Sequence, residues 1–298
     1  MKKYLVLLII LFLCLGGYFI ASFMPDVPAY SVPESSSTPK RIISINPAAT
    51  EIIYSLECED RLIAVSNFCD YPPQAQEIAK IGGDINPNFE RINALRPDLI
   101  ILQGRCENVV DFCEQKQIEY INIQLRNTEE FYHNIKWLGE KLECQNEAET
   151  LCNKIRKELE TIRAKVSGLK KRKVFFSLYR TPGTLTSITT IGPETFLNEL
   201  IDMAGGVNIF NDVKQDYPVI SKETLLKRQP EIIIEPYSHS KDETSVLNDW
   251  RNLEGLKAVE NKNVHVVDAD IMLKPGPRVV KAALILAKLI HPEAFDER

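Results

Sequence analysis

The chain lacks the short motifs that mark most enzyme active sites. Its 298 residues contain no glycine-rich phosphate loop, no G-x-S-x-G and no H-E-x-x-H. Histidine is scarce and shows no ligand spacing, so we assign the four residues to surface or core positions, with His239 the best candidate for contact with a ligand: His133, His239, His265 and His291. The chain has no C-x₂-C pair, which argues against structural zinc. We therefore expect a protein that is not an enzyme and carries neither a metal nor another cofactor.

An excess of positive charge is also missing. The formal net charge is −5, and the one basic cluster, Lys170–Lys173, is short. Since no basic stripe is available to neutralise phosphates, we expect no nucleic-acid partner. With 44% hydrophobic and 26% charged residues, the composition is that of a soluble globular protein with room for about two domains.

The N-terminus departs from this average. Lys2 and Lys3 precede an uncharged stretch of 21 residues, Tyr4 to Met24, which is typical of an export signal or a membrane anchor. Three interpretations stay open. Leu11-Phe12-Leu13-Cys14 resembles a lipobox, with Cys14 as the candidate lipidation site; cleavage near Ala21 or Ala29 would free the protein; or the segment is an uncleaved anchor. All three place the folded part outside the cytoplasm.

Residues 25–40 are rich in proline and serine and predict a flexible linker. Six cysteines follow Cys14, all in the first half of the chain, at positions Cys58, Cys69, Cys106, Cys113, Cys144 and Cys152. An even number in an exported chain permits disulfides, with 15 possible connectivities. The short span between Cys106 and Cys113 makes that pair our favoured bridge.

One segment occurs twice. NFERINALRPDLII at residues 88–101 matches SKETLLKRQPEIII at residues 221–234. At a constant spacing of 133 residues, Glu90 aligns with Glu223 and Pro97 with Pro230. Each copy predicts a short helix opened by an acidic residue, ended by a proline and followed by a buried strand. A repeat at this distance indicates two similar lobes, and the cleft between two lobes is a common ligand site.

Short apolar runs alternate with helical patterns in both halves, which predicts two α/β lobes with mostly parallel central sheets. Expected strands are 41–45, 62–65, 99–102, 120–123, 173–178, 232–234 and 264–267. We expect helices at 145–167, at 192–204, closed by Gly205-Gly206, and at 277–290, with Thr50 as the N-cap of a helix near the start. Apolar Leu151, Ile155, Leu159 and Ile162 share one face of the long helix, which predicts a rigid connector.

The predicted organisation therefore has five parts. Residues 1–24 are a signal peptide or a membrane or lipid anchor, and 25–40 are the linker. Residues 41–144 form the N-terminal lobe, 145–170 the connector helix, and 171–298 the C-terminal lobe.

Several motifs, in order along the chain, resemble the extracytoplasmic solute-binding proteins of ABC importers with a helical backbone. This class binds vitamin B12, ferric siderophores or haem. The resemblance covers about residues 40–293 and is closest to the periplasmic vitamin B12-binding proteins. It rests on the runs 41–44, 47–51, 69–72, 82–83, 86–90, 95–100, 205–208, 217–218, 221–223 and 275–278.

The resemblance implies the class III periplasmic binding protein fold and an ABC permease dimer with its ATPase as partner. In the family, one glutamate per lobe pairs with permease arginines, and Glu90 and Glu223 match those positions. Two equivalent carboxylates on a pseudo-symmetric protein suit a two-fold permease. Without the family, the simpler interpretation is that each glutamate stabilises a helix N-terminus.

The resemblance also implies a cleft lined by loops at the carboxyl ends of strands. The matching ligand-contact positions are Pro47, Ala48, Tyr71, Gly83, Tyr179, Tyr217 and Arg278. Tyrosines at positions 71 and 217 would pack on a corrin ring, although a purely structural role for each stays open. A vitamin B12 binder of this family has tryptophans in its cleft. This chain has no tryptophan at the matching positions, because its two tryptophans, Trp137 and Trp250, lie elsewhere in the sequence.

We therefore predict a corrinoid as ligand. The alternative within the class is a ferric siderophore or haem, for which Arg180 and Arg278 would supply positive charge. Two other classes stay open: an enzyme with a metal cluster on the six cysteines, and a sensor or adhesion module that uses the same fold.

Overall fold

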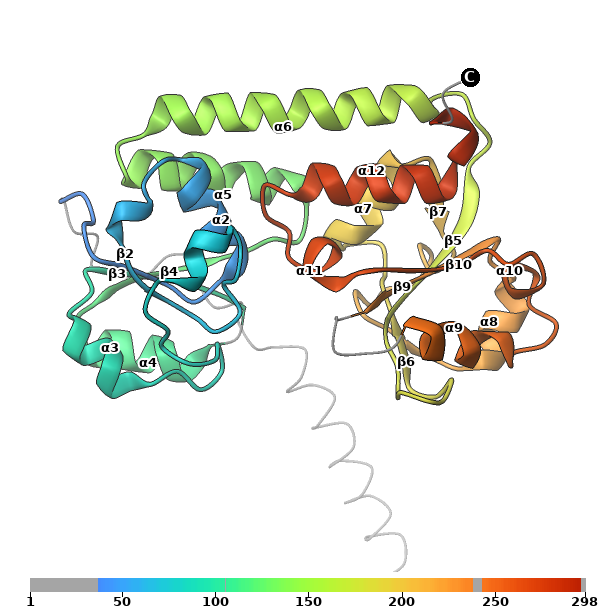
Figure 1. Ribbon diagram of the computed structural model, residues 1–298, viewed down its shortest axis with the longest axis horizontal. Helices are drawn as coiled ribbons and strands as arrows, with labels where there is room; N and C mark the ends of the chain where they lie inside the picture. The colour runs from blue at the N-terminus through green and yellow to red at the C-terminus, as the bar shows by residue number, and fades with distance from the viewer. Residues whose placement is uncertain (1–36, 105, 238–242, 296–298) are drawn as a thin grey trace, which may run out of the picture.

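The structure, a computed structural model, describes residues 37–104, 106–237 and 243–295. Two α/β lobes lie side by side, and helix α6 (Gln145–Val166) runs along one side of both (Figure 1). Within the described residues, no helix is long and apolar enough to cross a membrane. The predicted anchor at 1–24 with Cys14, most of the linker at 25–40 and His239 lie outside these residues.

The N-terminal lobe is built on a parallel sheet of order β2-β1-β3-β4. Its strands are β1 (Ile42–Ser44), β2 (Leu62–Val65), β3 (Leu99–Gln103) and β4 (Glu119–Ile123). Helices cover both faces, as a parallel sheet requires. These are α2 (Pro47–Ser55) and α5 (Thr128–Lys141) on the side of α6, and α3 (Phe89–Leu95) and α4 (Glu107–Lys116) on the other, with 3₁₀ turns at Glu59–Arg61 and Pro73–Gln76.

The C-terminal lobe centres on β5 (Arg172–Tyr179), which pairs in parallel with β9 (Ile232–Tyr237) and β7 (Gly206–Asn208); β10 (Val264–Asp268) extends the sheet beside β9. Two short strands, β6 (Ile188–Thr190) and β8 (Val219–Ile220), add antiparallel pairs beyond the end of β5. The helices are α7 (Phe196–Met203), α8 (Lys222–Arg228), α9 (Glu243–Arg251), α10 (Lys257–Glu260), α11 (Ala269–Met272) and α12 (Val279–Ile290), before a 3₁₀ turn at Pro292–Ala294.

Helix α6 joins the lobes through buried packing. Its 22 residues span about 33 Å at the α-helical rise, and Ile155, Leu159 and Ile162 are buried. The helix contacts α5 of the N-terminal lobe and α12 of the C-terminal lobe. The predicted fold class, two α/β lobes joined by one long helix, is therefore confirmed.

The two copies of the repeated segment fold alike. Asn88 and Ser221 cap α3 and α8, accepting hydrogen bonds from Arg91 N and Thr224 N. Both helices have seven residues and end at a residue in the left-handed region, Arg96 or Gln229, each with φ of 47°. The proline follows directly, because it cannot continue the helix.

Some predicted helix starts were wrong. The N-cap of α2 is Asn46, whose Oδ1 accepts from Ala49 N at 2.7 Å, whereas Thr50 lies buried inside the helix. A cap side chain must reach back to the open backbone N–H groups, and Asn46 stands at that point. Helices α7 and α12 begin at Phe196 and Val279, later than predicted from Gly192 and Pro277; Thr195 caps the former.

Candidate ligand-binding site

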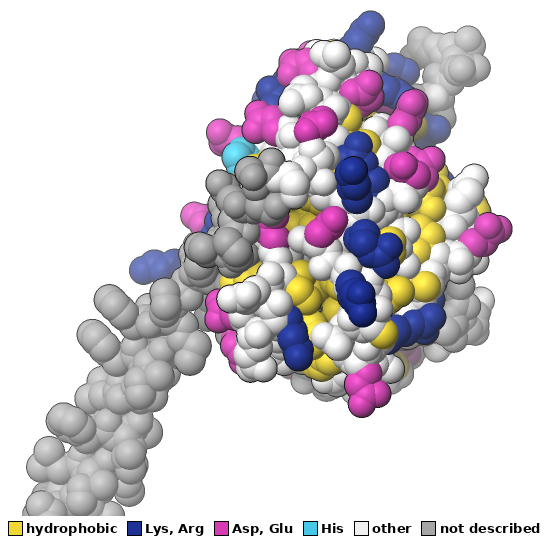
Figure 2. All heavy atoms as spheres, turned by 90° about the vertical axis from the view of Figure 1, so that its left-hand side faces the viewer, with side chains coloured by type: hydrophobic (Ala, Val, Ile, Leu, Met, Phe, Trp, Pro, Cys, Tyr) yellow, Lys and Arg dark blue, Asp and Glu magenta, His cyan; other side chains and the backbone are white. Residues whose placement is uncertain are grey.

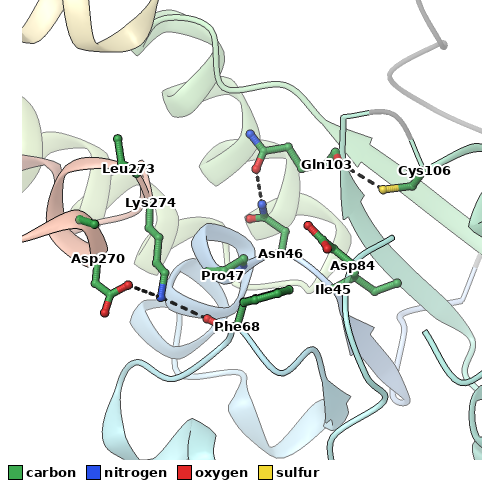
Figure 3. Close-up of a pocket in the computed structure, with 11 residues that line it drawn as sticks. Ile45, Asn46, Pro47, Phe68, Asp84, Gln103, Cys106, Asp270, Leu273 and Lys274 are labelled. Atoms are coloured by element: carbon green, nitrogen blue, oxygen red, sulfur yellow. Dashed lines mark hydrogen bonds and ion pairs between the residues drawn. The ribbon is translucent and has the colours of Figure 1, made fainter. Parts of the chain in front are cut away.

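A cavity of about 330 Å³ opens between the lobes at the carboxyl ends of β1 and β3 (Figure 3). We call it the interlobe pocket. Its walls come from the loops after β1, β2 and β3 and from α11 of the C-terminal lobe. It is lined by Ile45, Asn46, Pro47, Phe68, Asp84, Gln103, Cys106, Ala269, Asp270, Leu273 and Lys274.

The N-terminal wall of this pocket is held rigidly. Asn46 caps α2 with its Oδ1 and donates from Nδ2 to Gln103 Oε1, so the side chain has both ends engaged. Proline 47 follows at the first helical position, where its missing N–H costs nothing. The sequence predicted Pro47 as a contact residue, and it lines the pocket.

Phe68 contributes the largest apolar side chain and was missed by the sequence analysis. The residue is 51% exposed, an unusual state for phenylalanine. Predicted Gly83 lies against it, because a Cβ there would sit 3.8 Å from Phe68 Cε2. Leu273, 39% exposed, lines the same pocket from the other lobe. The position of Phe68, directly before the Cys69-Asp70-Tyr71-Pro72 motif, was the available signal.

Lys274 carries the positive charge of the interlobe pocket, and it is neutralised twice. Its Nζ lies 2.9 Å from Asp270 Oδ1 and 2.9 Å from Asp70 Oδ1, the latter across the lobe boundary. It also donates to Phe68 O (Figure 3). Burial alone would lower the pKa of Lys274, but the bonds to Asp270 and Asp70 outweigh burial and raise it. The ammonium group of Lys274 is therefore already paired with carboxylates of the protein.

A second cavity, which we call the outer pocket, has a volume of about 500 Å³. Tyr71, the residue after Asp70, is part of its lining. Predicted Tyr71 and Arg278 meet here: the guanidinium carbon lies 4.1 Å from the ring centre. Arg278 also donates to both oxygens of Glu51, at 2.6–3.1 Å. The pocket is lined by Glu51, Tyr54, Ser55, Glu59, Tyr71, Pro72, Gln74, Pro277 and Arg278.

Glu51 is the deeply buried member of this ion pair. It is 3% exposed, and burial raises the pKa of its carboxyl, while the hydrogen bond from Arg278 opposes the rise. Gly276 lets the lobes approach here, because a Cβ at that position would lie 2.9 Å from Glu51 Oε2 and 3.4 Å from the Cα of Ala48. Predicted Ala48 is thus buried beneath the C-terminal lobe and is not among the residues that line the interlobe pocket.

A third cavity between the lobes is strongly acidic. This acidic pocket, about 320 Å³, is lined by Arg126, Asn127, Glu130, Pro193, Glu194, Thr195, Glu199 and Asp216. Its single arginine, Arg126, is 2.8 Å from Glu130. Glu199 accepts from Thr128 N at 2.8 Å, a further contact between the lobes.

The remaining predicted contact residues are on the C-terminal lobe. Tyr179 ends β5 and is 58% exposed; Tyr217 follows Asp216 of the acidic pocket and is 59% exposed. Neither lines the three pockets described above. Their exposed rings nevertheless leave apolar surface uncovered on the loops of this lobe.

Arg180 is not available to an anionic ligand. It is 4% exposed and donates to Glu235 Oε2 at 2.9 Å and to Asp249 Oδ2 at 2.7 Å. Its Nη1 also reaches Thr184 O, and Trp250 donates to the same Glu235 oxygen. This closed network is part of the lobe core, so Arg180, which the sequence analysis considered only for a siderophore or haem, is already engaged within its own lobe.

The predicted docking glutamates lie far from each other. Helices α3 and α8 occupy opposite ends of the molecule, on the side away from α6 (Figure 1). Glu90 and Glu223 are both exposed in the first turns of these helices. Figure 2 shows that the end of the N-terminal lobe carries a row of Lys and Arg side chains among apolar ones, with acidic side chains around it. Side chains of both charges therefore lie at this end, and docking through Glu90 stays a prediction.

The six described cysteines are unbridged and buried. The favoured Cys106–Cys113 bridge was wrong. Cys106 is the N-cap of α4 and Cys113 lies seven residues along the helix, about 10 Å at the helical rise, beyond the roughly 7 Å limit for the Cα atoms of a disulfide. Across the ranges that the structure describes, no group of three or more His, Cys, Asp or Glu could hold a metal ion.

Comparison with known proteins gives a consistent result. A family model described as periplasmic binding protein matches residues 42–271. A vitamin B12-binding protein of Vibrio cholerae is 31% identical over 248 residues, covering 82% of this chain and 86% of that protein. An ABC transporter substrate-binding lipoprotein of Bacillus subtilis is 27% identical over 267 residues, covering 87% and 82%.

Solved structures agree with the fold. The crystal structure of a periplasmic vitamin B12 binding protein of Vibrio cholerae superposes with a TM-score of 0.73 at 29% identity, covering 87% of this chain and 99% of that one. A possible iron-binding, periplasmic solute-binding protein of Staphylococcus epidermidis gives 0.76 at 26% identity, covering 86% and 100%.

Proposed function

Because the chain belongs to the periplasmic binding protein family, we propose that it is the solute-binding protein of an ABC importer and that its ligand is a corrinoid. It holds the ligand between its lobes outside the cytoplasm and passes it to a permease dimer with its ATPase. Binding and release suffice for this role, and no covalent step is proposed. The relatives named for vitamin B12 and for ABC transport support it.

One observation carries the choice of ligand: every basic side chain described in the three pockets is already paired. Lys274 is held by Asp70 and Asp270, Arg126 by Glu130 and Arg278 by Glu51. Each pocket also has more acidic than basic side chains. An anionic ligand would meet repulsion and no unpaired cation among these residues.

A corrinoid suits such a site better than its competitors. It offers a broad apolar macrocycle ringed by neutral amides, which match exposed aromatic rings and amide side chains. Phe68 and Leu273 supply apolar surface, and Asn46 and Gln103 supply amides at the same pocket. Haem has two carboxylates and ferric siderophores have anionic chelate groups, so both ligands need positive charge in the site. Arg180 and Arg278 do not supply it, because each is already paired with a carboxylate of the protein.

Equilibrium calorimetry on the purified full chain tests the ligand. We expect cyanocobalamin to bind at micromolar concentration or tighter, and haem and a ferric hydroxamate siderophore to bind much more weakly. Absence of cobalamin binding at micromolar concentration, with tight binding of either iron ligand, would overturn the corrinoid proposal and leave the importer role. If none of these binds, the neighbouring genes decide, because an importer needs a permease and an ATPase and a sensor or adhesion module does not.

We also propose that Cys14 anchors the protein to the membrane through a lipid. The Bacillus subtilis relative is named a lipoprotein, which supports this proposal. A Cys14→Ser variant expressed in a bacterial host should move from the membrane fraction to the soluble extracytoplasmic fraction. Retention of the variant on the membrane would favour an uncleaved anchor instead.

A further inference from the structure

Two thiols from distant parts of the N-terminal lobe lie in contact. Cys58 Sγ and Cys144 Sγ are 3.3 Å apart, although 86 residues separate them in the chain. Cys58 follows α2, and Cys144 is the N-cap of the connector helix α6. Two sulfur atoms this close need only a small shift to reach the bond length of a disulfide.

Backbone contacts hold both cysteines where they are. Cys58 N donates to Ile53 O at 3.1 Å, and Cys144 N donates to Gly139 O at 2.8 Å. Arg61 Nη1 also reaches Leu142 O at 2.9 Å, which ties the turn after α2 to the turn before α6. The approach of the two thiols is therefore a product of the packed lobe and not of one movable loop.

The other described cysteines have different neighbours. Cys69 contacts Ser66 Oγ at 3.2 Å, Cys106 contacts Gln103 O at 3.3 Å, and Cys152 contacts Tyr132 O at 3.9 Å. Three of them, Cys69, Cys113 and Cys152, are fully buried, whereas Cys58 is 4% and Cys144 7% exposed. Both residues of the pair are thus buried, but less completely than these three.

We propose that Cys58 and Cys144 form a disulfide that fastens the N-terminal lobe to the start of the connector helix. In this step the Sγ–Sγ bond forms, each thiol loses its proton, and the two electrons reduce an external disulfide to two thiols. The proposal fits the oxidising setting of an exported protein and is independent of the ligand. Closing a loop of this length restricts the unfolded chain, so the bridge stabilises the lobe.

The reduced pair also resists ionisation. Burial, together with the neighbouring Cys58, raises the pKa of the Cys144 thiol to about 12. A thiolate is therefore hard to form at Cys144, and oxidation of the folded protein should become faster as the pH rises.

Peptide mapping of the full chain tests the bridge. Purified protein is equilibrated in glutathione buffers that run from reducing to oxidising, free thiols are alkylated, and the digest is analysed by mass spectrometry. We expect one internal cross-linked peptide joining Cys58 to Cys144, while Cys69, Cys106, Cys113 and Cys152 stay alkylated. Alkylation of both Cys58 and Cys144 in the oxidising buffer, or a bridge from either to another cysteine, would overturn the proposal.

Thermal unfolding gives a second readout with matched controls. The oxidised wild type should unfold several degrees above the reduced protein, and Cys58→Ser and Cys144→Ser should each abolish this redox-dependent difference. Cys106→Ser, which changes a cysteine of similar exposure, should preserve it. A redox-dependent shift that survives in Cys58→Ser would contradict the assignment.

Discussion

Phe68 is the residue on which we expect ligand affinity to depend most directly. The residue is 51% exposed, lines the interlobe pocket and lies against Gly83. Truncation in Phe68→Ala removes apolar contact with a macrocycle, and we expect cobalamin to bind about tenfold more weakly, roughly 1.4 kcal/mol. Calorimetry measures the change. Leu169→Ala, an exposed apolar residue away from the pockets, is the control and should leave affinity unchanged; an equal loss in both would show that the ring has no special role.

Arg278 has a structural role that the sequence analysis did not assign. Its guanidinium neutralises Glu51, which is 3% exposed. Arg278→Ala would leave a buried carboxylate unpaired, and we expect it to lower the free energy of unfolding by about 3 kcal/mol near neutral pH. Urea denaturation measures this loss, and Arg163→Ala, on the exposed face of α6, should cost far less.

The pH dependence of this variant follows from the sign of the shift. Burial raises the pKa of Glu51 above its usual value, and loss of Arg278 removes the main group that opposes this rise. The folded variant then takes up a proton at higher pH than the unfolded chain, so stability is recovered as the pH falls through the raised pKa. The penalty relative to wild type should therefore be smaller at about pH 5.5 than at about pH 7.5. An equal penalty at both would show that Glu51 does not titrate there.

At the scale of residues, the sequence predicted which residues lie at the pockets better than it predicted which side chains they pair with. Pro47, Tyr71 and Arg278 were selected from loop motifs, and they lie at pockets between the lobes. The pairing of Arg278 with Glu51 spans 227 residues, and no local pattern reveals which carboxylate a distant arginine meets. The partners of Arg180 could not be predicted for the same reason, since Glu235 and Asp249 come together only in the folded lobe.

At the scale of elements, the contact between α5 and α6 predicts that a substitution in α5 destabilises the protein, although helix propensity alone would favour it. Gly139 lies within α5, and alanine there would favour the helix by about 1 kcal/mol. However, its Cβ would lie 2.4 Å from Ala148 Cβ on α6, and an alanine methyl cannot move aside. Overpacking should win, so we expect Gly139→Ala to be destabilising by about 1–3 kcal/mol in urea unfolding.

The matched variants separate these two effects. Adding Ala148→Gly removes the opposing methyl and should restore part of the stability, whereas neighbouring Glu140→Ala, on the exposed side of α5, should change little. A more stable Gly139→Ala would mean that the helices separate freely, which the rigid-connector interpretation forbids.

Elements were predictable where one local signal dominates. Most of the parallel strands are short apolar runs, and the structure has these within a residue or so of the expected ends. The exceptions are β9, which runs on to Tyr237, and β7, which the sequence analysis did not predict. Helix starts were less predictable, because several residues near one end can cap. Asn46 and Thr50 both carry an oxygen acceptor, and only the fold shows which of them faces the open N–H groups.

At the scale of the whole molecule, we expect α6 to limit how the lobes move. One continuous helix packs on α5 and α12, and the pairs Glu51–Arg278 and Asp70–Lys274 cross between the lobes on the ligand side. Closure by a large hinge would have to break these contacts. We therefore expect the candidate site to be largely preformed, which would reduce the ordering that binding requires.

The repeated segment carries the predicted link to the importer. If Glu90 and Glu223 pair with permease arginines, Glu90→Arg with Glu223→Arg should leave the cobalamin Kd within about twofold of wild type. The same double change should reduce transport at least about 100-fold, because each new arginine would face like charge. Radiolabelled cobalamin uptake in cells lacking the native protein measures delivery. Calorimetry on the same variant measures binding.

A matched pair separates docking from simple support of a helix N-terminus. Glu107 and Glu243 are exposed glutamates in the first turns of α4 and α9, one in each lobe. Glu107→Arg with Glu243→Arg removes the same favourable interaction with helix dipoles, worth about 0.3–1 kcal/mol each, and should leave transport intact. If this control lost uptake as fully as the first pair, or if the first pair kept it, Glu90 and Glu223 would serve only their helices. Loss of uptake in the first pair alone would mean that the carboxylates, placed by two copies of one segment at opposite ends of the molecule, match the two-fold symmetry of the permease.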